Sequence, residues 1–168
     1  MVIKYVGKLS LKYKIYNMIT IEDFKIKHPN KVRFIGLDLG SKRIGVSICD
    51  ERQSIATPFK TINKTNTNEL IDELKIIIEE NNIGGIIVGN PVNMDGTMGR
   101  SAQSVNDVAS NISKNIDLPV ILWDERLSTV GAFNLSSLLD VNVSKRVKTI
   151  DQNAAAFILQ GAIDFLKN

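Results

Sequence analysis

The sequence of 168 residues contains one cysteine and one histidine, and it has no long uninterrupted apolar run. Because Cys49 is alone, an intrachain disulfide is impossible and a zinc site built from cysteines is excluded. His28 precedes a proline in a lysine-rich segment, which favours a solvated imidazole over a catalytic one. A membrane-spanning helix needs about 20 consecutive apolar residues, so we expect no membrane partner.

Sequence signals for export and for repeat architecture are also scarce. Lysines interrupt the first residues, which lack the continuous apolar segment of a secretory signal, so we expect none. Cys49 lies in an apolar run, which is typical of a buried thiol in a reducing compartment. The absence of internal repeats argues against a solenoid. The length suits a single domain with a substantial core.

Positive charge is concentrated at one end of the chain. Residues 1–33 hold eight Lys or Arg and two acidic residues, whereas the other 135 residues hold thirteen Lys or Arg and sixteen acidic residues. The body of the protein is therefore mildly acidic. The net charge of +3 alone is weak support for binding a polyanion, and local basic clusters matter more.

Two regions of the chain differ in pattern. Residues 1–31 are lysine-rich without a clean period, and we interpret them as a basic N-terminal extension. Residues 32–168 predict one α/β domain. Apolar runs and alternation predict five strands, over 32–38, 44–49, 53–62, 85–89 and 119–123. Helical periodicity and capping pairs predict four helices, over 66–81, 98–115, 128–139 and 149–166.

The order of these elements predicts a mixed five-stranded sheet flanked by helices. The first three strands follow one another directly, so we expect them to be antiparallel. The last two strands flank a helix, and such a unit has parallel strands with a right-handed crossover. Pro58 cannot donate a backbone hydrogen bond, so the third predicted strand should be bent or lie at an edge.

Three carboxylates occupy settings that suit a shared site. Asp38 ends the first predicted strand, Glu125 follows the last one, and Asp151 begins the last predicted helix. In open α/β sheets, sites form beyond the carboxyl ends of parallel strands. Converging carboxylates repel one another unless a cation lies among them, and oxygen ligands without His or Cys favour Mg²⁺ or Mn²⁺. Two such ions about 3.5–4 Å apart can activate water for phosphodiester cleavage.

Each acid also has an ordinary structural explanation. Asp151 in a first helical turn would interact favourably with the helix dipole. Glu125 lies in an Asp-Glu-Arg triplet, which commonly forms a local ion pair in a solvated turn. Asp38 has the weakest such explanation, because burying a carboxylate without a partner is costly. The combination of the three is more specific than any one of them.

Polar and basic residues near this predicted edge are candidates for contact with a substrate. Asn93 lies in a polar loop after the 85–89 strand that we expect to contact a substrate backbone, although Asp95-Gly96 is also an ordinary turn signal. Asp95 is a further candidate for the chemistry. The basic candidates, which would hold phosphates beside the cleaved bond, are Lys42, Arg43, Arg126 and Arg146.

Four stretches of the chain resemble the YqgF/RuvX family of nucleases with a ribonuclease H-like fold. They are IGLDLGSKRIGVSICD, IIVGNPVNMDGT, WDERLST and IDQNAAAFILQ, and with their spacing they cover about residues 33–167. The resemblance implies that Asp38, Glu125 and Asp151 are an acidic triad that binds divalent metal. It also implies a cytoplasmic bacterial enzyme that matures the 5′ end of 16S rRNA. We expect precursor rRNA as its partner, free or in ribosomal particles, and a monomer or homodimer.

Other functions remain open at this stage. The same family resemblance allows a Holliday junction resolvase that acts on branched DNA. The strand–Asp–Gly start also resembles the first phosphate loop of actin and the sugar kinases, but those proteins need two such lobes and this chain has one. A non-catalytic RNA-binding module is the third alternative, and the presence of all three acids argues against it.

Overall fold

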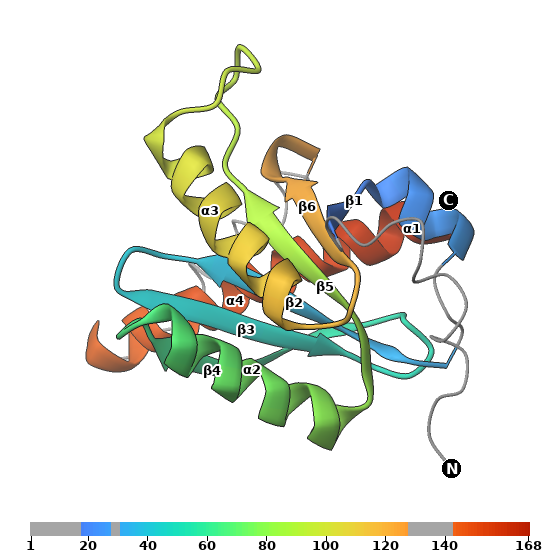
Figure 1. Ribbon diagram of the computed structural model, residues 1–168, viewed down its shortest axis with the longest axis horizontal. Coiled ribbons are helices and arrows are strands. Elements are labelled where there is room, and N and C mark those ends of the chain that lie inside the picture. Colours follow the sequence, from blue (N-terminus) through green and yellow to red (C-terminus); the bar gives the residue numbers. More distant parts are fainter. Residues whose placement is uncertain (1–17, 28–30, 128–142) are drawn as a thin grey trace.

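The computed structural model describes residues 18–27, 31–127 and 143–168, and within the last range it describes side chains from Asn153 onward. A six-stranded sheet in the order β1-β6-β5-β2-β3-β4 forms the centre of this part of the chain (Figure 1). The elements are β1 (Met18–Ile19), α1 (Ile21–Lys27), β2 (Arg33–Leu39), β3 (Arg43–Cys49), β4 (Ala56–Asn63), α2 (Thr67–Asn81), β5 (Ile83–Asn90), α3 (Arg100–Asn115), β6 (Val120–Asp124), the 3₁₀ turn η1 (Glu125–Leu127) and α4 (Val143–Lys167).

The sheet is mixed, as the sequence predicts. Strands β2, β3 and β4 are antiparallel neighbours, and β5 and β6 continue the sheet in parallel with β2. The predicted number of five strands is wrong, because β1 adds a sixth strand parallel to β6. Only Met18 and Ile19 form this strand, and two residues are too few for a period-two pattern to be visible.

Helix α1 packs against the same sheet as the other described helices. Its Phe24 is 1% exposed, and the ring lies edge-on to that of Phe34 with centroids 5.1 Å apart. Residues 18–27 thus share the core of the 32–168 region, although their lysine-rich sequence resembles an extension. The division of the chain at residue 31 stays a prediction.

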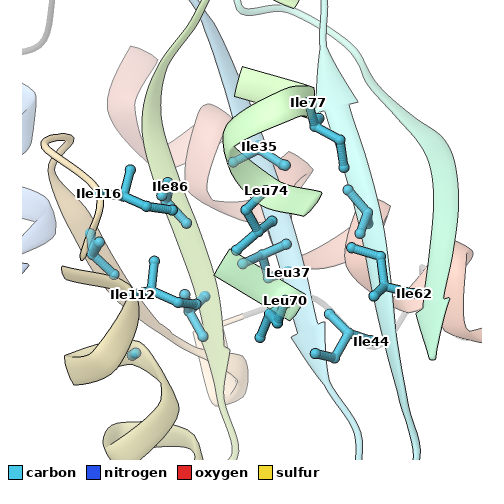
Figure 2. Close-up of a cluster of buried hydrophobic side chains, with 14 of the residues drawn as sticks. Ile35, Leu37, Ile44, Ile62, Leu70, Leu74, Ile77, Ile86, Ile112 and Ile116 are labelled. Atoms are coloured by element: carbon cyan, nitrogen blue, oxygen red, sulfur yellow. The ribbon is translucent and has the colours of Figure 1, made fainter. Parts of the chain in front are cut away.

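Helices cover both faces of the sheet (Figure 1). Helices α2 and α3 bury one cluster of aliphatic side chains, in which Leu74 and Ile112 meet Ile35 and Leu37 of β2 (Figure 2). Helix α4 covers the other face, where Ile158 and Leu159 join Phe34, Ile87 and Trp123. This second face carries the site described below. No helix in the described ranges is both long and apolar enough to cross a membrane.

Local sequence signals account for several element boundaries. Asn66 caps α2, since its side-chain oxygen accepts the Glu69 N–H at 2.9 Å. Strand β4 is the sheet edge expected from Pro58, and its register with β3 shifts beside that residue. The predicted start of the last helix near Thr149 is wrong, because α4 begins at Val143. The helix predicted over 128–139 lies outside the described residues.

Candidate functional site

Asp38 lies near the end of β2 on the face covered by α4. Side chains alternate along a strand, and two residues earlier Gly36 meets α4 so closely that an added Cβ would lie 2.6 Å from Leu159 Cβ. On β3 the residue paired with Asp38 is Gly45. On the other side, Leu37 of β2 pairs with Val88 of β5, so the next residue of β5, Gly89, lies beside Asp38. Glycines on both neighbouring strands leave the half-buried Asp38 carboxylate room on this face.

Glu125 reaches the same position from β6. The residue follows the end of β6 in the turn η1, and its Oε1 atom lies over Gly89, 2.6 Å from where an added Cβ would stand. On the other side of that glycine, Ile158 Cδ1 of α4 would be 2.4 Å from the same Cβ. Gly89 is thus a gap in the side-chain layer, and the Glu125 carboxylate fills it between β6 and α4.

The two carboxylates interact electrostatically. Burial raises the pKa of Glu125 most, and the negative charges of Asp38 and then Asp124 raise it further. A fold in which a half-buried carboxylate lies in the field of two others is unfavourable without a compensating cation. The donor set consists of hard carboxylate oxygens, with no cysteine or histidine on this edge, and this chemistry fits Mg²⁺ or Mn²⁺. Among the described side chains no three His, Cys, Asp or Glu residues form a metal-binding group, so a complete site needs a further ligand.

Asp151 is the third acid predicted for the site. It lies inside α4 rather than at the helix start, as α4 begins eight residues earlier at Val143. The explanation based on the helix dipole of a first turn therefore does not apply. Asp151 precedes Ala155 by four residues and Ile158 by seven, and from this spacing the sequence predicts that it shares their helix face. The side chains of Asp151 and of Arg146 lie outside the described residues.

Arg126 forms the local ion pair that the Asp-Glu-Arg triplet suggests. Its Nε and Nη2 atoms donate to the two carboxylate oxygens of Asp124 at 3.0 and 2.6 Å. This pairing lowers the pKa of Asp124. The same guanidinium donates through Nη1 to the Asn93 carbonyl at 3.4 Å. Arg126 therefore connects the strand end that carries Glu125 with the loop between β5 and α3.

The predicted basic contacts at the other end of the site lie on the β2–β3 hairpin. Lys42 is exposed in the turn, and Arg43 is partly buried at the start of β3. Sequence reasoning missed Lys64, whose backbone N–H donates to the Lys42 carbonyl at 3.0 Å. That bond brings two lysines together at the edge where β2 and β4 end. The sequence offers little that would place Lys64 beside Lys42, because nothing in it fixes the register of β4 against β3.

Comparison with known proteins identifies the family. The sequence model of the family described as "RuvX: Holliday junction resolvase" matches residues 32–165. The chain belongs to the RuvX family. A relative of this RuvX chain in Pelagibacter ubique, named "Putative pre-16S rRNA nuclease", is 95% identical over 151 residues, which are 90% of this chain and 100% of the relative. A protein of the same name in Cereibacter sphaeroides is 44% identical over 147 residues, covering 88% of this chain and 92% of the relative.

A solved structure with a similar fold is that of Thermus thermophilus RuvC in complex with Holliday junction substrate. The match has a TM-score of 0.52 and 10% identity, and it covers 76% of this chain and 91% of that one. At this identity the likeness concerns the fold alone. The RuvX chain thus has the ribonuclease H-like architecture that its sequence motifs imply.

Proposed function

We propose that this chain is a metal-dependent nuclease that hydrolyses phosphodiester bonds and processes the 5′ end of precursor 16S rRNA in the cytoplasm. Asp38, Glu125 and Asp151 are its metal ligands. Lys42, Arg43 and Arg146 bind substrate phosphates, with Asn93 and Arg126 at the opposite side of the site. The names of the two relatives, both "Putative pre-16S rRNA nuclease", support this substrate.

The observation that carries the proposal is that the Asp38 and Glu125 carboxylates lie close enough to interact electrostatically, with Glu125 in the gap over Gly89. The charges of Asp38 and Asp124, together with burial, raise the pKa of Glu125, so ionised Glu125 is under electrostatic strain. A bound divalent cation removes that strain and stabilises the ionised form. Natural sequences tolerate such local conflicts mainly where function requires them.

The residues divide the work of hydrolysis by position. Asp38 on a strand and Glu125 in a turn anchored over Gly89 are held by rigid elements, which fixes the distance between their oxygens. Divalent cations held by these carboxylates would activate water for attack and would neutralise charge on the phosphate. Lys42 and Arg43 extend from the hairpin beside Asp38, where they can orient the phosphate chain. Arg126 orients the turn that carries Glu125 through its ion pair with Asp124.

Cleavage of a precursor 16S rRNA fragment tests the proposal. The purified chain is incubated with the RNA in Mg²⁺ or Mn²⁺, beside Asp38→Asn and Asp50→Asn variants. Asp50 is a matched control, since its carboxylate accepts the Ser54 and Ile55 N–H groups in the turn that follows β3. We expect wild type and Asp50→Asn to cleave the RNA, and Asp38→Asn to be inactive although folded. Undiminished cleavage by Asp38→Asn rejects the assignment.

A second candidate function is cleavage of branched DNA. The description of the matching family as Holliday junction resolvase favours it. A four-way DNA junction in the same assay separates the two candidates, because both require Asp38 and they differ only in the nucleic acid. Faster cleavage of the junction than of the precursor RNA would replace the first candidate by the second.

A further inference from the structure

The loop between β5 and α3 contains a turn whose polar side chains form hydrogen bonds with one another. Figure 1 shows this loop projecting from the body of the molecule. Two backbone hydrogen bonds close the turn, from Asn93 N to Thr97 O at 3.0 Å and from Gly96 N to Asn93 O at 2.8 Å. Gly96 has a φ of +84°, a conformation that favours glycine and completes this type of turn.

Side chains within the turn bind one another. Asp95 Oδ1 accepts the Thr97 N–H at 2.9 Å and the Thr97 hydroxyl at 2.6 Å. Asn93 Nδ2 donates to that hydroxyl at 2.9 Å. These bonds lower the pKa of Asp95, which is consistent with a structural role for its carboxylate. Asn93, Asp95 and Thr97 thus share hydrogen bonds within the turn, and the contact of this loop with substrate through polar groups stays a prediction.

What the turn presents to its surroundings is a methionine. Met94 at the apex is 92% exposed, which is the largest exposure of any large apolar side chain in the described part of the chain. Met98, where the loop returns to α3, is 62% exposed, and its sulfur accepts a hydrogen bond from Asn106 Nδ2 at 3.4 Å. Two exposed methionines on one preorganised loop form an apolar surface, whereas single exposed apolar residues need no explanation.

This apolar surface is connected to the carboxylate site. Arg126 follows Glu125 directly and donates to Asn93, the residue before Met94. Leu127, next in the chain, is also 58% exposed. The loop leaves the carboxyl end of β5, the same sheet edge at which Asp38 and Glu125 lie. A nucleic acid with a phosphate at the carboxylates would therefore lie at the same sheet edge as this loop.

We propose that Met94 packs against an unstacked base of the nucleic acid beside the cleaved bond, with Met98 flanking it. This inference rests on the proposed nuclease function. A base offers the flat, polarizable face that a thioether side chain contacts well, whereas a phosphate or ribose hydroxyl finds no hydrogen-bond donor on a methionine. Exposed Arg100, two residues after Met98, supplies a cation for the backbone of the same nucleotide. The loop thus selects substrates with an unpaired base near the cleavage site.

Binding by a cleavage-deficient protein tests this contact apart from catalysis. The probe is a fluorescein-labelled RNA hairpin with a single-stranded 5′ extension, together with versions that carry one abasic ribose at each extension position in turn. Fluorescence anisotropy gives the Kd for the full chain with Asp38→Asn, alone and combined with Met94→Gln, Met94→Leu or Ile76→Gln. Ile76 on α2 is 55% exposed and serves as the control for loss of an exposed apolar side chain elsewhere.

We expect Met94→Gln to weaken binding of the intact RNA about tenfold, the scale of one stacked base. Met94→Leu and Ile76→Gln should stay within about twofold of the parent, since Leu keeps an apolar contact and Ile76 lies elsewhere. One abasic RNA should bind the parent as weakly as Met94→Gln binds intact RNA, with no further loss when the two changes are combined. Equal Kd values for the parent and Met94→Gln would overturn the proposal. So would a result in which the loss of affinity from Met94→Gln adds to the loss from the abasic site for every abasic RNA.

Failure of the base contact can be distinguished from failure of the proposed nuclease function. Normal binding by the Met94→Gln protein, with cleavage abolished by Asp38→Asn, rejects the base contact and leaves the nuclease intact. It would assign the methionines to another partner, such as a protein. Cleavage that survives Asp38→Asn rejects the nuclease assignment itself, whatever Met94 does.

Discussion

Replacing Gly89 by alanine perturbs the gap that the Glu125 carboxylate fills. The new methyl carbon would lie 2.6 Å from Glu125 Oε1 and 2.4 Å from Ile158 Cδ1. Ordinary carbon contacts are about 3.5–4.0 Å long, so each of these atoms must move by roughly 1 Å. Both are the ends of side chains, and the backbone can therefore stay in place.

Stability and activity should respond differently to this change. Overpacking costs about 1–3 kcal/mol, and because only side-chain ends must move we expect a value near the lower limit. Displacement of a catalytic group by about 1 Å can lower a rate by about 10²-fold. Gly89→Ala should thus lose roughly 100-fold in kcat for the precursor RNA while remaining folded at 25 °C. Thermal unfolding and single-turnover cleavage measure the two effects.

A second substitution separates the two clashes. Ile158→Val removes the Cδ1 atom that lies 2.4 Å from the new methyl carbon and leaves the clash with Glu125 unchanged. The Gly89→Ala/Ile158→Val protein should therefore lose less stability than the two single changes would in sum, and its activity should stay about 100-fold below that of wild type. Full activity in Gly89→Ala, or full recovery of activity in the double variant, would refute the reasoning that Gly89 makes room for Glu125.

Three further predictions concern the surrounding fold. Gly36→Ala should cost more than Gly89→Ala, about 3 kcal/mol in urea unfolding, because its Cβ meets the Ala155 carbonyl at 2.9 Å and backbone cannot swing aside. Cys49 should resist iodoacetamide in the native protein, as burial raises its thiol pKa, and react on unfolding. Asp50→Asn should lower stability by about 1 kcal/mol at pH 7. Hydrogen bonds lower the folded pKa of Asp50, so this difference should persist above the unfolded pKa and vanish as the pH falls through the folded value.

The sequence predicts most of the sheet because strong local patterns and tertiary packing agree there. The buried run 85–89 lies within β5, and the antiparallel order of β2, β3 and β4 follows from short connections. β1 and α1 were not predicted, since a two-residue strand and a seven-residue helix depend on β6 and on the burial of Phe24 rather than on any period of their own.

For the site, the sequence identifies the important residues, but it reveals less about how the fold holds them in place. It places Asp38 and Glu125 at one edge, and the structure brings their charges together. It gives no sign that Gly89 leaves the gap that the Glu125 carboxylate fills, because a close approach between β5, η1 and α4 depends on three segments far apart in the chain. It also reads the loop after β5 as polar, and the internal bonds of Asp95 and Thr97 could not be seen from composition.

Metal binding to the carboxylate edge tests the central claim most directly. Isothermal titration calorimetry with Mn²⁺ on the full chain, without nucleic acid, should show binding in the micromolar to millimolar range. Asp38→Asn should weaken that binding at least tenfold, and Asp50→Asn should leave it unchanged. No detectable binding by the wild-type protein at millimolar Mn²⁺, or equal binding by wild type and Asp38→Asn, would contradict the assignment of this edge as a metal-dependent nuclease site.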